Sequence, residues 1–447
     1  MYIYIYIYIY IYTHIIKILI LTSLGVFAPL RLQVMSLSAM PVFLLTSLAI
    51  TGQLNYLSLM NYDMITTSLL SLTFWVLLLI VFSQFQARMV KSLCALFLVL
   101  GLSLVLSFST PRALMFYFFF EWSLLPIFII VIGWGYQIER LKASLFILFY
   151  TLFASLPLLV LIIIIIITSQ VSLIYIYRSL SNIARGHTLP SLMLIGAFLV
   201  KFPMFFVHQW LPKAHVEAPV GGSIILAGVL LKLGGYGIIR VSALLRPCGA
   251  LEGVLILALL GGRILRAVCV SLRDLKVIIA YSSVVHMAFI IAGCVSVTSW
   301  GINGAVVIIV AHGVCSSGIF SSANIIYERS HSRNLVQNKG MLNIFPAISI
   351  LWFLICMANF GGPFSYNLLG EILLIVNLAT LGLPLLLRAG IISFFSAGYS
   401  LILYSGTQQG PTLSGAFSIS SINYREILIM FSHVWPLLIL LMSPSLV

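Results

Sequence analysis

The chain has 447 residues, of which 62% are hydrophobic and only 7% are charged, whereas about 25% of the residues in an ordinary soluble domain are charged. So few charges cannot cover the surface of a water-soluble fold, which excludes soluble, disordered and coiled-coil proteins and leaves a polytopic membrane protein. The net charge of +14 arises from 23 Lys and Arg against nine Asp and Glu. Because the basic residues fall mostly in short gaps between apolar runs, we attribute the excess to membrane topology and expect no nucleic-acid partner.

After Met1, residues 2–12 repeat Tyr and Ile in strict alternation. Alternation has the period of a strand rather than of a helix. The segment lacks the basic head and cleavage site of a secretory signal and the Arg-rich pattern of a transit peptide. We interpret residues 1–12 as a low-complexity extension outside the fold.

The remaining chain contains about fourteen apolar stretches that could cross a hydrocarbon layer of about 30 Å as helices. They lie near 14–30, 36–50, 65–84, 91–109, 112–134, 143–168, 191–217, 219–240, 250–270, 275–295, 300–324, 343–378, 381–405 and 426–443. We therefore predict an all-α membrane protein, divided into N-terminal helices (13–110), a first half (111–240), a second half (250–405) and a C-terminal helix (426–447). A β-barrel would need many short alternating strands instead.

Two of these stretches are too long for one span, and each contains a helix-breaking residue. Pro203 follows Lys201-Phe202 and cannot donate a hydrogen bond to the carbonyl of Leu199. Pro363 follows Gly361-Gly362 in the other stretch. Discontinuous helices at corresponding positions of two halves are the best sequence indication of a transport pathway. We predict such helices near 201–203 and 361–363, with a structural kink as the alternative at each.

The basic residues also predict orientation. With the N-terminus outside, the inward gaps hold Arg31, Arg88, Lys91, Arg140, Lys142, Lys213, Arg263, Arg266, Arg273, Lys276, Arg329, Arg333, Lys339 and Arg425. The outward gaps hold Lys17, Arg112, Arg178, Arg185, Arg240 and Arg246. Since positive residues favour the inner side, both termini are predicted to face outward. Lys201, Lys232 and Arg388 then remain within spans.

Six ionisable residues fall deep within predicted spans, where a charge costs at least ~2.5–3.5 kcal/mol. They are Glu121, Lys201, Lys232, His286, His312 and Glu371. Six such groups on six helices predict a row in the membrane plane. Because burial disfavours a charged form and a nearby opposite charge favours it, a row of this kind can pass protons. We expect Glu121 and Lys201 to form an ion pair whose separation releases a proton from the lysine.

The segment Trp210 to Pro219 lies beside the first break and carries further polar residues. His215 and Glu217 are two residues apart, which is not the spacing of a helical metal site. We expect His208, His215 and Glu217 to support the row, together with Pro203 and Pro363.

No redox or cofactor chemistry is legible in this chain. It has no GxGxxG, no P-loop and no acidic cluster for a divalent metal. The six cysteines contain no CxxC pair, so we predict no metal centre and no cofactor site in this chain.

Several motifs resemble those of the antiporter-like membrane subunits of respiratory complex I, the NADH:ubiquinone oxidoreductase. The most specific block runs from Val200-Lys201-Phe202-Pro203 through Trp210-Leu211-Pro212-Lys213-Ala214-His215-Val216-Glu217-Ala218-Pro219 to Leu231-Lys232-Leu233-Gly234-Gly235-Tyr236-Gly237. Further matches are Asp274-Leu275-Lys276, Ala280-Tyr281-Ser282-Ser283, His286-Met287-Ala288 and Asn367-Leu368-Leu369-Gly370-Glu371. The likeness extends from about residue 63 to the C-terminus.

The resemblance implies fourteen helices in two inverted halves and a role in proton pumping within the membrane arm. It gives Glu121 and Lys201 the first half-channel, Lys232 the central relay, His286 and His312 the connecting relay, and Glu371 the end of the second half. It also implies other membrane-arm subunits and the lipid bilayer as partners, with NADH, FMN, iron–sulfur clusters and ubiquinone in partner subunits. The expected location is the mitochondrial inner membrane, with both termini on the intermembrane-space side.

Two alternatives stay open at this point. A subunit of a multi-component cation/proton antiporter would share the row of charges. A scaffold or passive channel, in which the charges only hold helices together, belongs to a different class of function.

Overall fold

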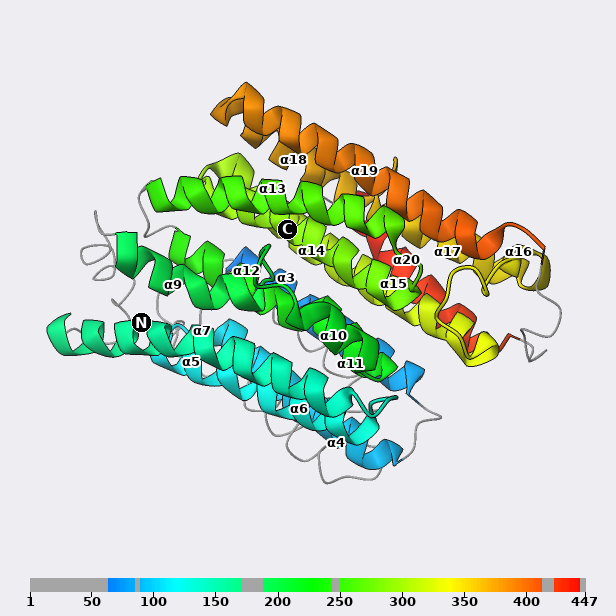
Figure 1. Cartoon of the computed structure of the whole chain (residues 1–447). Coiled ribbons are helices and arrows are strands. Elements are labelled where there is room, and N and C mark those ends of the chain that lie inside the picture. Colours follow the sequence, from blue (N-terminus) through cyan, green and yellow to red (C-terminus); the bar gives the residue numbers. More distant parts are fainter. Residues whose placement is uncertain (1–62, 85–88, 170–187, 243–248, 412–421, 443–447) are drawn as a thin grey trace, which may run out of the picture.

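The structure is a computed structural model that describes residues 63–84, 89–169, 188–242, 249–411 and 422–442. These ranges form helices joined by short connections, and the only β-type pairing among them is an isolated bridge between Asp274 and Asn334. Figure 1 shows the long helices lying side by side. The predicted all-α membrane fold is confirmed.

The helices of the N-terminal part and first half are α3 (Met64–Ser83), α4 (Val90–Ser109), α5 (Ala113–Trp122), α6 (Leu124–Trp134), α7 (Arg140–Ser169), α9 (Thr188–Lys201), α10 (Trp210–Glu217), α11 (Val220–Ile225) and α12 (Leu231–Ser242). A π-helical turn, η2 (Leu226–Leu230), joins α11 to α12. Segments α5 and α6 together make one span that is interrupted at Ser123.

The helices of the second half and C-terminal part are α13 (Gly249–Ser271), α14 (Leu275–Val295), α15 (Ser299–Ser330), α16 (Met341–Ile344), α17 (Pro346–Asn359), α18 (Tyr366–Leu381), α19 (Leu383–Gln408) and α20 (Tyr424–Met442). Within the described ranges, nine helices are long and apolar enough to cross a membrane, and α17 and α18 are shorter apolar helices. The first two predicted spans, 14–30 and 36–50, and the repeat at 1–12 lie outside the described residues.

The first predicted helix break is present. Helix α9 ends at Lys201 and α10 begins at Trp210, so residues 202–209 form the connection between them. Because Pro203 has no N–H, the carbonyl of Leu199 accepts its hydrogen bond from Met204 N instead, at 3.1 Å. The bond thus spans five residues rather than four, and the chain leaves the helix at this point. Phe206, four residues beyond Phe202, has a positive φ of 77°.

The second break repeats this arrangement. Helix α17 ends at Asn359, α18 begins at Tyr366, and Gly362 N donates to the carbonyl of Met357 at 2.9 Å, again across five residues. Phe364 has a positive φ of 66°, and so does Gly361, at 69°. The two halves therefore interrupt a helix in the same way, although one break contains two glycines and the other none.

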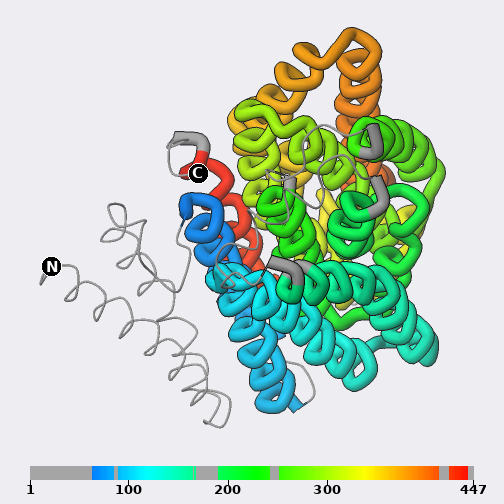
Figure 2. The backbone as a smooth tube through the Cα atoms, turned by 90° about the vertical axis from the view of Figure 1, so that its left-hand side faces the viewer, coloured from blue at the N-terminus to red at the C-terminus, as the bar shows by residue number. Residues whose placement is uncertain are grey.

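The helices are arranged around α15. It packs against α14, α18, α20, α17, α11 and α3, and its whole apolar window is buried. Figures 1 and 2 show α4 to α7 on one side of the bundle and α18 and α19 on the other. Most residues in the apolar windows of α7 and α19 are not buried within the chain, as expected of helices that face lipid or another subunit.

The predicted place of Arg263 and Arg266 in an inward loop is wrong. Helix α13 continues to Ser271, so both residues belong to a helix. Arg263 is exposed, whereas Arg266 is fully buried. The loop after α13 is short, and it keeps only Arg273 from that group.

Candidate functional site

The first group of buried ionisable residues lies where α5, α6 and α9 meet. The ammonium of Lys201, the last residue of α9, donates to the carbonyl of Phe120 at 2.5 Å and to Ser123 Oγ at 3.3 Å. It also lies 3.4 Å from the centroid of the Phe120 ring. The interruption at Ser123 thus supplies both oxygen atoms that Lys201 contacts.

Glu121 lies beside this lysine without touching it. The two side chains interact electrostatically, but within the described ranges neither carboxylate oxygen of Glu121 has a hydrogen-bond partner or an ion pair. The expected Glu121–Lys201 ion pair is therefore not formed in this structure. Lys201 instead contacts the backbone carbonyl of Phe120, the residue before Glu121.

The second group begins at Lys232, which is fully buried on α12 directly after the π-helical turn η2. Its Nζ lies 2.9 Å from Nδ1 of His312 on α15. A π-helical turn inserts one residue into a helix and is frequent at functional sites. Here the π-helical turn immediately precedes the start of α12, where Lys232 lies and contacts His312 of α15.

The chain of contacts continues from His312. The rings of His312 and His286, on α14, have centroids 5.1 Å apart. Nδ1 of His286 lies 3.8 Å from Oε1 of Glu371 on α18, and its Nε2 lies 3.2 Å from the hydroxyl of Tyr399 on α19. All of these side chains are buried. Four of the six predicted residues are therefore joined by direct side-chain contacts.

Glu371 also touches the second helix break. A Cβ placed on Gly361 would lie only 3.0 Å from Glu371 Oε2. The glycine therefore leaves the space that the carboxylate fills. Pro363 follows two residues later and contributes to the break, as Pro203 does in the first half.

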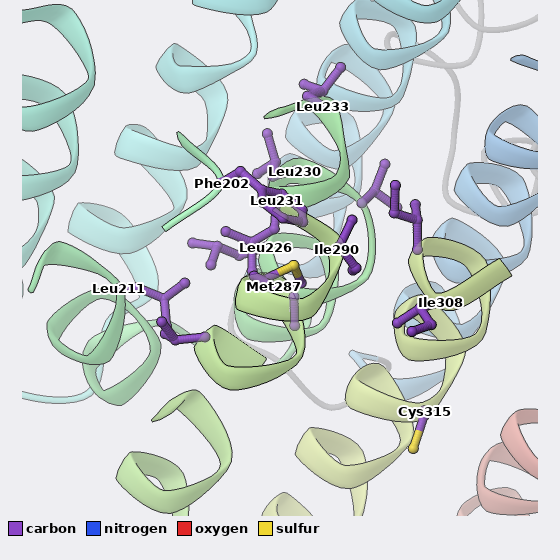
Figure 3. Close-up of a cluster of buried hydrophobic side chains, with 14 of the residues drawn as sticks. Phe202, Leu211, Leu226, Leu230, Leu231, Leu233, Met287, Ile290, Ile308 and Cys315 are labelled. Atoms are coloured by element: carbon purple, nitrogen blue, oxygen red, sulfur yellow. The ribbon is translucent and has the colours of Figure 1, made fainter. Parts of the chain in front are cut away.

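An apolar cluster accompanies the row of ionisable groups. Figure 3 shows Phe202 beside Leu230 and Leu231, with Leu226, Met287 and Ile290 close by. Helix α12 approaches the first break closely, since a Cβ on Gly234 would lie 2.7 Å from Cβ of Phe202. No hydrogen bond within the described residues links Lys201 to Lys232. The structure therefore divides the predicted row into two groups.

The predicted supporting histidines lie close to the first break. His208 belongs to the connection between α9 and α10, and its ring stacks on Phe205 with a centroid distance of 5.7 Å. His215 is fully buried on α10 and stacks on Phe320 of α15 at 4.4 Å. Neither ring nitrogen of His215 has a hydrogen-bond partner in the described part of the chain.

Glu217 belongs to a separate polar cluster at the end of α10. The amide group of Gln137 lies between Glu217 Oε1, at 3.2 Å, and the guanidinium of Arg333, at 2.9 Å. Lys276 donates to the carbonyls of Val216 and Ala218 at 3.3 and 3.4 Å. These contacts tie α10 to the start of α14 and to the loop after α15.

A cavity of about 310 Å³ opens beside this cluster. Its lining includes Glu217 and Val216 together with Glu139, Lys142 and Lys213. Glu217 itself is buried, and its contacts do not extend to the row of relay residues. Across the described residues, no group of three or more His, Cys, Asp and Glu side chains could hold a metal ion.

The sequence analysis missed two residues near the relay. Tyr399 contacts His286 directly, and Arg266 is wholly buried in the same region. Tyr399 carried no signal, because a tyrosine in an apolar span is unremarkable. Arg266 did carry one, because it lies within the predicted 250–270 span and therefore belonged with the intramembrane charges.

The arrangement brings together groups that can exchange protons. Imidazole, carboxyl and phenol groups can each accept or give up a proton. The contacts of Lys232 with His312 and of His286 with Tyr399, at 2.9 and 3.2 Å, are within hydrogen-bond reach, whereas His286 and Glu371, at 3.8 Å, have to approach each other before a proton can pass. Burial keeps bulk water away from the series between Lys232 and Glu371.

Comparisons with known proteins agree with this picture. Residues 111–396 match the family model described as NADH:quinone oxidoreductase/Mrp antiporter, TM. The chain is 42% identical over 416 residues to NADH-ubiquinone oxidoreductase chain 4 of Ceratitis capitata, which covers 90% of this chain and 91% of that protein.

Solved structures show the same fold. A chain of respiratory complex I from Thermus thermophilus with bound NADH superposes with a TM-score of 0.84 at 24% identity, covering 97% of this chain and 95% of the other. A chain of the Mrp complex from Dietzia sp. DQ12-45-1b gives a TM-score of 0.81 at 15% identity, covering 98% and 94%. On its sequence and its fold, the chain belongs to the NADH-ubiquinone oxidoreductase chain 4 family.

Proposed function

We propose that six ionisable groups, of which five are buried and Glu121 is half-buried, carry protons through this chain, which is a proton-pumping membrane-arm subunit of NADH:ubiquinone oxidoreductase. Glu121 and Lys201 serve the first half-channel. Lys232 receives the proton from that side, and His312 and His286 pass it to Glu371 at the end of the second half.

The observation that carries this proposal is the series of neighbouring ionisable side chains from Lys232 to Glu371, in which Lys232 and His312 are hydrogen-bonded, the two imidazole rings adjoin and His286 lies 3.8 Å from Glu371. It crosses four helices, α12, α15, α14 and α18, and every member is buried. A structural ion pair needs two partners, whereas this series places two histidines between a lysine and a glutamate. Buried ionisable residues inside a membrane domain mark ion and proton pathways in most cases.

The first half works by a change of partner. Lys201 contacts a carbonyl and a hydroxyl, neither of which can take its proton. The carboxylate of Glu121 lies nearby and forms no hydrogen bond among the described residues. Movement of Lys201 towards Glu121 would stabilise the charged lysine, and movement away would favour release of its proton. We assign His208, His215 and Glu217 a supporting role at the connection after α9 and on α10, without direct contact to Lys201.

The partner subunits supply the chemistry that drives the movement. We place NADH, FMN, the iron–sulfur clusters and ubiquinone in those subunits and none of them in this chain. The other membrane-arm subunits and lipid cover the exposed faces of α7 and α19. We place the chain in the mitochondrial inner membrane, with both termini on the intermembrane-space side.

The cation/proton antiporter alternative has weaker support. The antiporter-type structure shares the fold at 15% identity, whereas the 42% identical relative is a chain 4 subunit. Rotenone-sensitive NADH oxidation that co-purifies with the chain would support the complex I assignment. Sodium-dependent proton exchange by the isolated assembly would favour the antiporter.

The relay is tested by Lys201→Ala and Glu121→Ala in the intact complex, reconstituted into liposomes. We expect coupled pumping through this chain to be abolished while the complex still assembles, measured as protons moved per NADH oxidised. Lys91→Ala, an exposed lysine at the start of α4, is the matched control. Normal proton-to-electron ratios in the two relay variants would refute the pumping role and favour the scaffold.

A further inference from the structure

The hydroxyl of Tyr399 contacts the relay but has no part in the proposed transfer. It lies 3.2 Å from Nε2 of His286, and Tyr399 is 1% exposed on α19. The tyrosine belongs to a buried stripe of this helix that also includes Ile392, Ser396 and Leu403. A spacing of three and four residues keeps such a stripe on one helix face, so the phenol reaches inward from a helix that is mostly exposed.

His286 lies between this hydroxyl and Glu371. Its Nδ1 is 3.8 Å from Oε1 of Glu371, while its Nε2 faces Tyr399. The ring is 0% exposed, and Nδ1 has no hydrogen-bond partner among the described residues. A neutral imidazole carries one N–H and one lone pair, and the hydrogen bond made by one nitrogen determines the state of the other. The tautomer of His286 therefore decides which of its two neighbours the proton faces.

The hydrogen of the Tyr399 hydroxyl determines that tautomer. Within the described ranges, the hydroxyl has Nε2 of His286 as its only hydrogen-bond partner. A buried donor without an acceptor is costly, whereas an oxygen that keeps one lone pair unused is tolerated more often. Tyr399 therefore donates to Nε2. The proton of the neutral ring is then on Nδ1, towards Glu371.

We propose that Tyr399 is a positioning residue for the last proton transfer, which sets the tautomer of His286 so that Nδ1–H faces Glu371. The inference rests on the proposed relay. Oε1 of Glu371 can accept this hydrogen bond whether the carboxyl group is ionised or carries its own proton on Oε2. The assignment is thus independent of the charge of Glu371 at rest.

The transfer step takes one proton in and gives one proton out. A proton that arrives from His312 enters His286 at Nε2, the only ring nitrogen with a lone pair. When Glu371 is unprotonated and within reach, Nδ1 gives its proton to Oε1. The ring is then neutral again, with its remaining proton on Nε2, which donates to the oxygen of Tyr399. Because a phenol hydroxyl can both donate and accept, Tyr399 bonds either tautomer and keeps its own proton throughout.

The test removes this hydroxyl in the intact complex, reconstituted into liposomes. Tyr399→Phe keeps the ring and its packing. We expect pumping to be about fivefold slower, as for the loss of one buried hydrogen bond, with unchanged KM for NADH and ubiquinone. The solvent deuterium isotope effect should rise, because proton transfer becomes rate-limiting. Tyr404→Phe is the matched control, since this half-buried tyrosine on α19 packs against Phe353, and it should leave both quantities normal.

Infrared spectroscopy measures the tautomer itself. The ring vibrations of neutral histidine differ between its two tautomers, and the bands of His286 are those lost in His286→Gln. We expect Nδ1–H in the resting wild type and a partial shift to Nε2–H in Tyr399→Phe, where no donor occupies Nε2. A wild-type spectrum with the proton on Nε2 at rest would overturn the assignment, even if Tyr399→Phe did not assemble.

The failure of this role and the failure of the relay give different results. Normal pumping by Glu371→Gln would overturn the relay itself. Loss of pumping in Glu371→Gln, together with a normal rate in Tyr399→Phe, would overturn only the role of Tyr399. A slower rate without a change in the isotope effect would do the same, because a packing defect would then account for it.

Discussion

The two halves of the molecule break a helix in the same way but connect their ionisable groups differently. Met204 and Gly362 each donate across five residues, and a phenylalanine with positive φ follows each break. In the second half, however, His312, His286 and Glu371 lie next to one another, and Lys232 at the end of the first half contacts His312. In the first half, Glu121 has no hydrogen-bond partner within the described ranges, and Lys201 contacts Phe120 and Ser123.

This difference shows that the helix break and the relay are separate parts of the design. The helix break changes the backbone hydrogen bonds, whereas contacts between side chains determine whether the ionisable groups are linked to one another. Under the proposed function, Lys201 has to exchange its contact with Phe120 for one with Glu121, and His286 and Glu371 have to close their separation of 3.8 Å.

The largest effect is expected from Lys232→Met, because this residue is where the series of contacts begins. The substitution keeps the apolar stem and removes the only side-chain partner that His312 has on α12. We expect loss of pumping as complete as that of Lys201→Ala, measured as protons per NADH in liposomes. Ser223→Ala is the control, since that hydroxyl is bonded only to its own helix at Val220. Retained pumping would show that the two halves work without this link.

A smaller effect, and one that separates the two breaks, is expected from substitutions within them. Gly361→Ala introduces a Cβ where φ is +69° and Glu371 Oε2 would be 3.0 Å away, which costs about 1 kcal/mol or more in strain. Pro203→Ala only adds an N–H, because Leu199 already receives a bond from Met204. Pumping should fall more in Gly361→Ala, and thermal unfolding of the complex should shift further. Equal losses of pumping and equal thermal shifts in the two variants would mean that both breaks tolerate a changed side chain to the same degree.

The smallest effect is expected from Ser123→Ala. It removes the weaker of the two contacts to Lys201, at 3.3 Å, and leaves the one to the Phe120 carbonyl, at 2.5 Å. The net loss of one such hydrogen bond is about 1 kcal/mol, so the pumping rate should fall only modestly and the proton-to-electron ratio should stay normal. A loss as large as that of Lys201→Ala would show that the hydroxyl itself carries protons in the first half.

The fold was largely predictable because it depends on local chemistry. Long apolar stretches predict membrane helices, and the missing N–H of Pro203 predicts where α9 ends. The interruption at Ser123 inside the 112–134 span was not predicted. A local signal for it was overlooked, because Pro126 has no N–H to donate to the carbonyl of Trp122, where α5 ends.

The site was predictable in its members but not in its connections. Depth within a span identified Glu121, Lys201 and Lys232, because a buried charge needs a reason wherever it occurs. Which groups touch depends on how helices pack, and a single sequence does not encode that visibly. The expected partners Glu121 and Lys201 are therefore apart in the structure, while Lys232 and His312 are in contact.

The length of α15 has a mechanical consequence. Its 32 residues extend about 48 Å, well beyond a hydrocarbon layer of about 30 Å, so one continuous helix is long enough to connect the membrane interior to a membrane surface. His312 lies near its middle, and Arg329 near its end pairs with Glu426 of α20 at 2.5 Å. The apolar window of this helix is buried within the chain. A displacement of one end of α15 therefore has to be accommodated by the neighbouring helices rather than by lipid.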